Sequence, residues 1–315
     1  MSKINKKIPI FQQLKELHGE PGELAAFAAA ALNENPNQQE LIALLQALAE
    51  NPHPQARPRL IDLFDEYASN GEVMDPGGKI RIWIIRALQP ISKPVDAPLF
   101  EKAALTYEYL PPQFREEAGP LRMAGVVALA GLDEELAAFH TSRLLVEKST
   151  DPMSGEPAVT AARLLASLDR SVSLYQYLYQ DPNETLPEIV SECLHLLTTI
   201  PTSLVPGLID RFSTSDNDLI LAGLFDLLIK HDEGLQGEEF LISFLEESKR
   251  YDAYRYLVAL IIAERRQDLL PALLPILRFE RDKEKVFILL DAFEPLKHDP
   301  EISKVVENLR QVYRK

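Results

Sequence analysis

Cysteine is almost absent from this chain, which has one cysteine, Cys193, in 315 residues. A single thiol cannot form an intramolecular disulfide, and it excludes zinc or iron–sulfur sites built from several cysteines. Basic residues are also scarce, since 33 Lys and Arg stand against 48 Asp and Glu, for a net charge of −15. Because affinity for nucleic acid depends on basic surface, we do not expect nucleic acid as a partner.

Long hydrophobic runs are missing as well. The longest uninterrupted apolar stretches are 24–32 and 257–263, far below the roughly 20 residues that cross a membrane as a helix. The basic start, residues 1–7, is followed by an apolar stretch that stops at Phe11, too short for an export signal. We therefore expect a cytoplasmic protein that does not enter a membrane.

Motifs for phosphate, metal or nucleophilic chemistry are lacking too. The chain has 13 glycines, and neither GxGxxG nor GxxxxGK[ST] occurs. None of the six histidines lies three or four residues from another, so no helical metal-binding pair exists. Cys193 and His195 are two residues apart, which puts their side chains on different faces of a helix. We expect no catalytic residue, no metal and no cofactor.

What the sequence has throughout is helical periodicity. Residues 216–231 carry apolar side chains at helical spacing, with Asp216 or Asn217 as the N-cap. Residues 187–199 repeat this pattern and begin with a proline, which suits a first helical turn. The tyrosines of 173–180 alternate, but helix-boundary residues flank them, so we predict a helix there as well.

The same periodicity predicts the buried residues. A free cysteine on an apolar helix face is commonly a small buried hydrophobe. We expect the seam between helices to contain Cys193, Leu224, Leu257 and Leu289.

The helical segments recur at a regular spacing. Five of them begin at Glu156, Leu186, Asp216, Arg250 and Asp282, which are 30, 30, 34 and 32 residues apart. A shorter amphipathic segment precedes each one. Paired helices repeated at this length are the signature of an α-solenoid. The first half pairs less regularly, as 24–32 with 38–49, 58–68 with 78–88, and 97–110 with 120–132.

We therefore predict an all-α fold, an α-solenoid (α–α superhelix) of about eight antiparallel helix pairs. Residues 1–20 form an N-terminal arm or leading helix, and 21–315 form a single solenoid. Its units are irregular over 21–132 and more regular over 134–296, and a closing helix follows at 301–313.

Two of the shorter segments resemble a known family. SLVPGLIDRF at 203–212 and DLLPALLPIL at 268–277 are similar to the first helix of HEAT repeats, which often carries a proline. HEAT repeats commonly have a basic residue early in the second helix, and most segments here lack it. They also commonly have an Asp in the turn, matched here by Asp151, Asp181, Asp216 and Asp282. The resemblance implies a HEAT-like solenoid whose second helices line a binding surface.

Such a surface favours a non-catalytic protein-binding scaffold or adaptor. Two alternatives stay open. One is a repeat-built enzyme such as a HEAT-like DNA glycosylase, which needs a basic groove and a catalytic Asp. Here Trp83 is the single tryptophan, and no Asp lies within a helical turn of it. The other alternative is an acidic inhibitor or immunity protein for a basic toxin or nuclease.

Acidic residues concentrate in 151–250, which has 6 basic and 17 acidic side chains, a net charge of −11. Six of the ten tyrosines lie in 175–179 and 251–256. Acidity can serve solubility alone, but it also suits a basic protein partner. Tyrosines that stay exposed on such a surface are good binding anchors. The candidate partner-binding residues are Tyr175, Tyr179, Asp216, Asp218, Tyr251, Tyr254 and Arg255.

Overall fold

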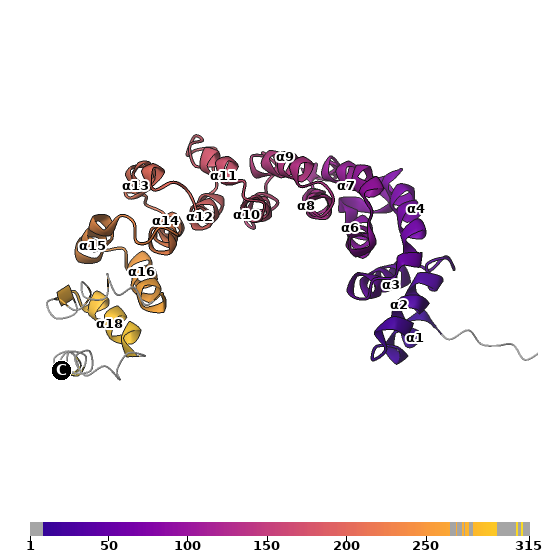
Figure 1. The fold of residues 1–315 in the computed structure, drawn as a ribbon, viewed down its shortest axis with the longest axis horizontal. Coiled ribbons are helices and arrows are strands. Elements are labelled where there is room, and N and C mark those ends of the chain that lie inside the picture. The colour runs from indigo at the N-terminus through magenta and orange to yellow at the C-terminus, as the bar shows by residue number, and fades with distance from the viewer. Residues whose placement is uncertain are drawn as a thin grey trace, which may run out of the picture. The chain divides into compact units, whose positions relative to one another are not determined.

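The computed structural model describes residues 9–264 and 280–294, and the isolated positions 269, 273, 275, 276, 307 and 310. Within these residues it has 17 α-helices, five short 3-10 helices and two strands of two residues each (Figure 1). The all-α prediction is therefore confirmed. Most of the predicted closing helix at 301–313 and most of the segment 268–277 lie outside the described residues.

The chain divides into two compact units, residues 1–164 and 165–315. In the first unit α2 packs on α3, α3 and α4 on α6, and α6, α7 and α9 on α8. Its helices are α1 (Ile10–Glu16), α2 (Pro21–Ala31), α3 (Gln38–Glu50), α4 (Arg57–Ala68), α5 (Gly71–Met74), α6 (Lys79–Leu88), α7 (Ala97–Ala104), α8 (Gly119–Ala130), α9 (Glu134–Leu145) and the start of α10 (Ala158–Ser167).

The second unit is a row of helices with a shorter layer beside it. Its helices are α11 (Ser171–Tyr177), α12 (Pro187–Leu196), α13 (Val205–Phe212), α14 (Asp218–Lys230), α15 (Glu238–Glu247), α16 (Tyr251–Ala263) and α18 (Lys283–Ala292). Helices α12, α14, α16 and α18 pack on one another in that order, and α11 and α13 pack on α12 and α14. Figure 1 shows α11, α13 and α15 on one side of this row.

Local sequence signals set many of the helix ends. The side chain of Asn217 caps α14 by accepting a hydrogen bond from the backbone N–H of Leu219. Pro187 is the first residue of α12, where its missing N–H is not needed. The residues predicted for the seam, Cys193, Leu224, Leu257 and Leu289, are all fully buried, which confirms that prediction.

A small hairpin replaces part of a predicted helix. The helix expected over 97–110 ends at Ala104, and strands β1 (Tyr109–Leu110) and β2 (Arg115–Glu116) pair in antiparallel register. The dipeptide Pro111-Pro112 follows β1 and favours the extended conformation of Leu110, although α7 itself ends seven residues before Pro111. Proline has no N–H for a helical hydrogen bond, and it pushes the preceding residue into the extended region.

Candidate functional site

Two of the predicted docking residues form a surface pair in α11 and the turn after it. The Tyr175 and Tyr179 rings have their centroids 5.0 Å apart, and the Tyr175 hydroxyl donates to that of Tyr179 at 3.1 Å. Arg211 of α13 lies with its guanidinium 5.3 Å from the Tyr179 ring and donates to the carbonyl of Gln180 at 2.7 Å. The pair is thus held from the neighbouring helix.

The predicted acidic pair at the start of α14 contacts a basic residue of this chain. Arg250 Nε donates to Asp218 Oδ1 at 2.7 Å, and Arg250 also hydrogen-bonds the backbone carbonyls of Ser215 and Asp216. The Asp216 carboxylate remains exposed, with Arg250 Nη1 at 3.4 Å. Arg250 therefore ties the start of α14 to the start of α16, and it neutralises part of the acidity expected to face a partner.

The tyrosines of α16 are placed differently from the prediction. Tyr254 is fully buried, so its prediction as a surface anchor is wrong. It lies three and four residues before Leu257 and Val258, on the apolar stripe that α16 turns to the core. Arg255 is exposed, as the partner-binding prediction requires, and Tyr251 Oη donates to Asp282 Oδ2 at 2.8 Å.

Tyr256, which the sequence did not single out, belongs to a polar cluster that joins three helices. Its hydroxyl donates to Asp226 Oδ2 of α14 at 2.6 Å. His195 Nδ1 of α12 lies 3.0 Å from the same oxygen, and Lys230 Nζ lies 2.7 Å from Oδ1. The Asp226 side chain is only 5% exposed, so its charge is balanced by these neighbours rather than by water.

The cluster shifts the protonation of its members. Burial alone would raise the pKa of Asp226, but the donors His195, Lys230 and Tyr256 outweigh it and hold that pKa below its usual value. The contact with Asp226 raises the pKa of His195. Burial, followed by the hydrogen bond to Asp226, raises the pKa of the Tyr256 hydroxyl. The Asp226 carboxylate therefore stays ionised and keeps the Tyr256 hydroxyl in its donating form.

A nucleophilic role for Cys193 is disfavoured by its surroundings. The thiol is fully buried, and burial raises its pKa, whereas nucleophilic attack needs a thiolate. In the described part of the chain, no group of three or more His, Cys, Asp or Glu side chains is placed to hold a metal ion.

Members of the cluster lie on a row that crosses successive helices. His195, Asp226, Tyr256 and Phe287 come from α12, α14, α16 and α18, and they are 31, 30 and 31 residues apart. The hydrogen bond between Tyr251 and Asp282 also joins residues 31 apart. With the same offset, Phe287 of α18 is the position equivalent to Tyr256 of α16. The side chains of Tyr256 and Phe287 are 39% and 52% exposed. We call these four residues the 195–287 row.

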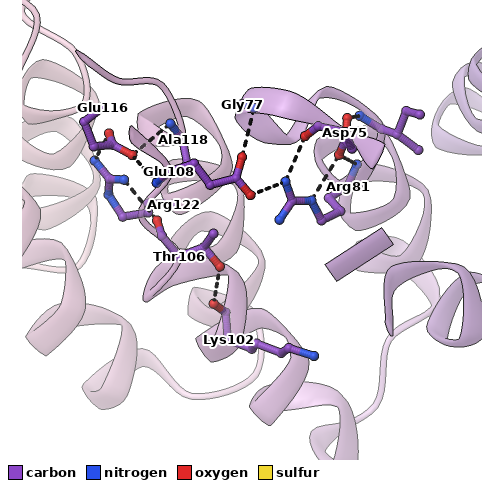
Figure 2. A network of polar contacts seen from close by, with 10 residues as sticks. Asp75, Gly77, Arg81, Lys102, Thr106, Glu108, Glu116, Ala118 and Arg122 are labelled. Carbon is purple, nitrogen blue, oxygen red and sulfur yellow. Dashed lines mark hydrogen bonds and ion pairs between the residues drawn. The ribbon is translucent and has the colours of Figure 1, made fainter. Parts of the chain in front are cut away.

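Buried arginines organise the first unit (Figure 2). In α6, Arg81 Nε donates to Asp75 Oδ2 at 3.0 Å and Nη2 to Glu108 Oε1 at 2.6 Å. In α8, Arg122 Nη2 donates to Glu116 Oε2 at 2.7 Å and Nη1 to the carbonyl of Thr106 at 3.0 Å. Each guanidinium has a carboxylate partner, so these networks hold the turns against the helices.

Three of the described helices carry a buried basic residue near their start. Arg81, Arg122 and Lys285 are buried basic residues early in α6, α8 and α18. In the sequence, Arg81 and Arg122 each follow an acid six residues earlier, in DPGGKIR from Asp75 and EEAGPLR from Glu116. This pattern is hard to recognise because one acid is Asp and the other Glu. The two copies are also 41 residues apart, whereas the segments of the second half recur at about 31 residues.

No helix in the described ranges combines the length and apolar character needed to span a bilayer. Comparison of the chain with protein-family models, with curated proteins and with solved structures finds no match. The functional argument therefore depends on the residues described above.

Proposed function

We propose that the chain is a HEAT-like α-solenoid that binds a protein partner and catalyses no reaction itself. The register of its contacts supports the repeat. In the second unit, the contact of Arg211 with Gln180 and that of His231 with Ile200 join residues 31 apart. In stacked repeats each unit touches its neighbours, so contacts recur at one repeat length.

In the first unit, contacts between neighbouring helices join residues that are further apart in the sequence than the 31 residues of the second unit. Arg57 contacts Asp96, and Arg143 contacts the carbonyl of Ala104, each across 39 residues. A longer and less uniform repeat there accounts for the weaker sequence signal in the first half. It also fits the inserted hairpin at 109–116, which lies between α7 and α8.

The observation that carries the binding proposal is the 195–287 row. Two aromatic side chains, Tyr256 and Phe287, stand half-exposed on adjacent helices of a packed row. Aromatic residues dominate the energetics of many interfaces, and one held in place before binding loses less entropy on association. The hydrogen bond to the buried Asp226 holds Tyr256 in this way.

Charge defines the partner's chemistry. The net charge of −11 over 151–250 favours a basic protein, and opposite charge raises the rate and selectivity of association more than its affinity. Binding should weaken with added salt, because exposed charges are screened within about 10 Å at 0.1 M.

Affinity purification from the native host tests this proposal. The chain and a Tyr256→Ser/Phe287→Ser variant serve as baits, with Val172→Ser of α11, an exposed position off the row, as the matched control. We expect a basic protein to be retained by the chain and the control and lost from the double variant. Recovery of the same proteins by all three baits would reject the row as the binding surface.

A further inference from the structure

A narrow apolar slot lies in the first unit, between α6, α8 and the segment that enters α10. It has a volume of about 310 Å³ and is lined by Ile85 and Arg86 of α6, Met123 and Val127 of α8, and Pro157. Sites for whole small-molecule ligands span about 300–1,000 Å³, so this slot is at the lower end. It has room for one or two side chains.

The apolar surface of the slot is already formed and open. Ile85 and Met123 are buried, while Val127 is 37% exposed. Helices α6 and α8 pack on each other, so the surface is carried by regular structure. Covering it with an apolar group would remove hydrocarbon from water, which contributes roughly 25 cal/mol per Å².

Arg86 and Glu156 are the charged residues of the lining, and they differ in their partners. The Glu156 carboxylate accepts hydrogen bonds from Thr160 Oγ1 at 2.8 Å and Thr160 N at 3.3 Å. Arg86 has its guanidinium 4.8 Å from the centroid of the Trp83 ring, and none of the described carboxylates pairs with it. Stacking on an indole holds the guanidinium in place and leaves its N–H donors free.

We propose that this slot binds a segment of a partner protein that presents an apolar side chain next to an Asp or Glu. The apolar side chain enters between Ile85, Met123 and Val127, and the carboxylate pairs with Arg86. A planar guanidinium and a carboxylate form two parallel hydrogen bonds, which adds directional selectivity to apolar burial. This acidic–apolar ligand differs from the basic partner proposed for the 195–287 row, so the slot is a second, independent binding site.

Selection from a phage library of random peptides tests the site without knowledge of the partner. The baits are the full chain, Val127→Arg, which fills the slot, and Val172→Arg, which adds the same charge to an exposed position on α11. We expect peptides with an acid beside an apolar residue from the chain and from Val172→Arg, and none from Val127→Arg. With Arg86→Glu as bait, the acid should be replaced by Lys or Arg.

Methyl NMR locates the binding. The chain has four methionines, and among the described ones Met123 lines the slot, Met153 lines an adjoining cleft that shares Pro120, Glu156 and Pro157 with it, and Met74 ends α5. A selected peptide should shift the Met123 methyl signal most strongly and leave that of Met74 in place. Because two charge-assisted hydrogen bonds are lost, Arg86→Ala should weaken the peptide by on the order of tenfold or more.

Three results would overturn the proposal. The first is a selection that yields no peptide whose binding depends on Val127, and the second is a consensus that ignores the charge at Arg86. The third result comes from a parallel titration with octanoate, a small acid with an apolar tail. If octanoate moves the Met123 signal and the selected peptides do not, the slot is a small-molecule site. Variants are compared at equal far-ultraviolet circular dichroism, so loss of fold is distinguished from loss of binding.

Discussion

Replacing Gly223 by alanine tests how closely α12 and α14 approach each other. A Cβ atom at Gly223 would lie 2.5 Å from the carbonyl oxygen of Ser191 and 2.8 Å from its Cα. Both atoms belong to the backbone of α12, so no side-chain rotation can make room. The two helices must move apart or deform for the methyl group to fit.

Two opposing effects set the magnitude. In an exposed helix interior, alanine is favoured over glycine by about 0.8–1 kcal/mol. Overpacking a well-packed contact costs about 1–3 kcal/mol. Because the obstacle here is backbone, we take the upper part of that range and expect Gly223→Ala to lower the free energy of unfolding by about 1–2 kcal/mol.

Urea unfolding followed by circular dichroism measures this free energy. The matched control is Gly22→Ala in α2, where an added Cβ meets nothing within 4 Å. This control should be neutral or stabilising by up to about 1 kcal/mol. If Gly223→Ala stabilised the chain as Gly22→Ala is expected to, the close approach of α12 and α14 would be refuted.

Three further perturbations test the core and the polar clusters. Tyr254→Phe should be neutral or stabilising by up to about 1 kcal/mol, because the buried hydroxyl has no hydrogen-bond partner among the described residues. Tyr256→Phe should lower the free energy of unfolding, because it loses the hydrogen bond to Asp226. Destabilisation by Tyr254→Phe would contradict this account. Arg122→Ala should cost about 3–5 kcal/mol in urea unfolding by leaving Glu116 and Glu147 buried without their partner, and a change below about 1 kcal/mol would reject the network as structural. NMR titration should find the pKa of His195 above its usual value of about 6.5. The contact of His195 with Asp226 then contributes fully to stability below about pH 6.5, and this contribution is lost as pH rises through the raised pKa. A His195 pKa at or below about 6.5 would refute the contact with Asp226.

Short-range signals predicted most of the helices, because their causes are local. Asn217 caps α14, Pro187 begins α12, and the apolar spacing placed Cys193 and Leu224 in the core. The helix predicted over 97–110 is wrong beyond Ala104. Thr106, Tyr107 and Tyr109 favour extended structure, and Pro111 restricts Leu110 to it, so the strand has a local signal that apolar spacing alone does not reveal.

Helical spacing alone could have placed Tyr254 in the core, because it lies three and four residues before Leu257 and Val258, whereas Tyr256 lies off that apolar stripe. Contacts between helices are different, because they depend on the register of one helix against the next. The pairing of His195 with Asp226 joins residues 31 apart. The offset predicts which residues of neighbouring helices are equivalent, but not which of their side chains meet.

Site-specific photocrosslinking tests most directly whether the 195–287 row binds a protein. Benzoylphenylalanine is introduced at Phe287 on the row, and at Val172 of α11, which is also exposed, as the control position. After irradiation in the native host, the account predicts a covalent adduct with a protein from position 287 and none from position 172. Equal adducts at both positions, or an adduct from position 172 alone, would contradict it.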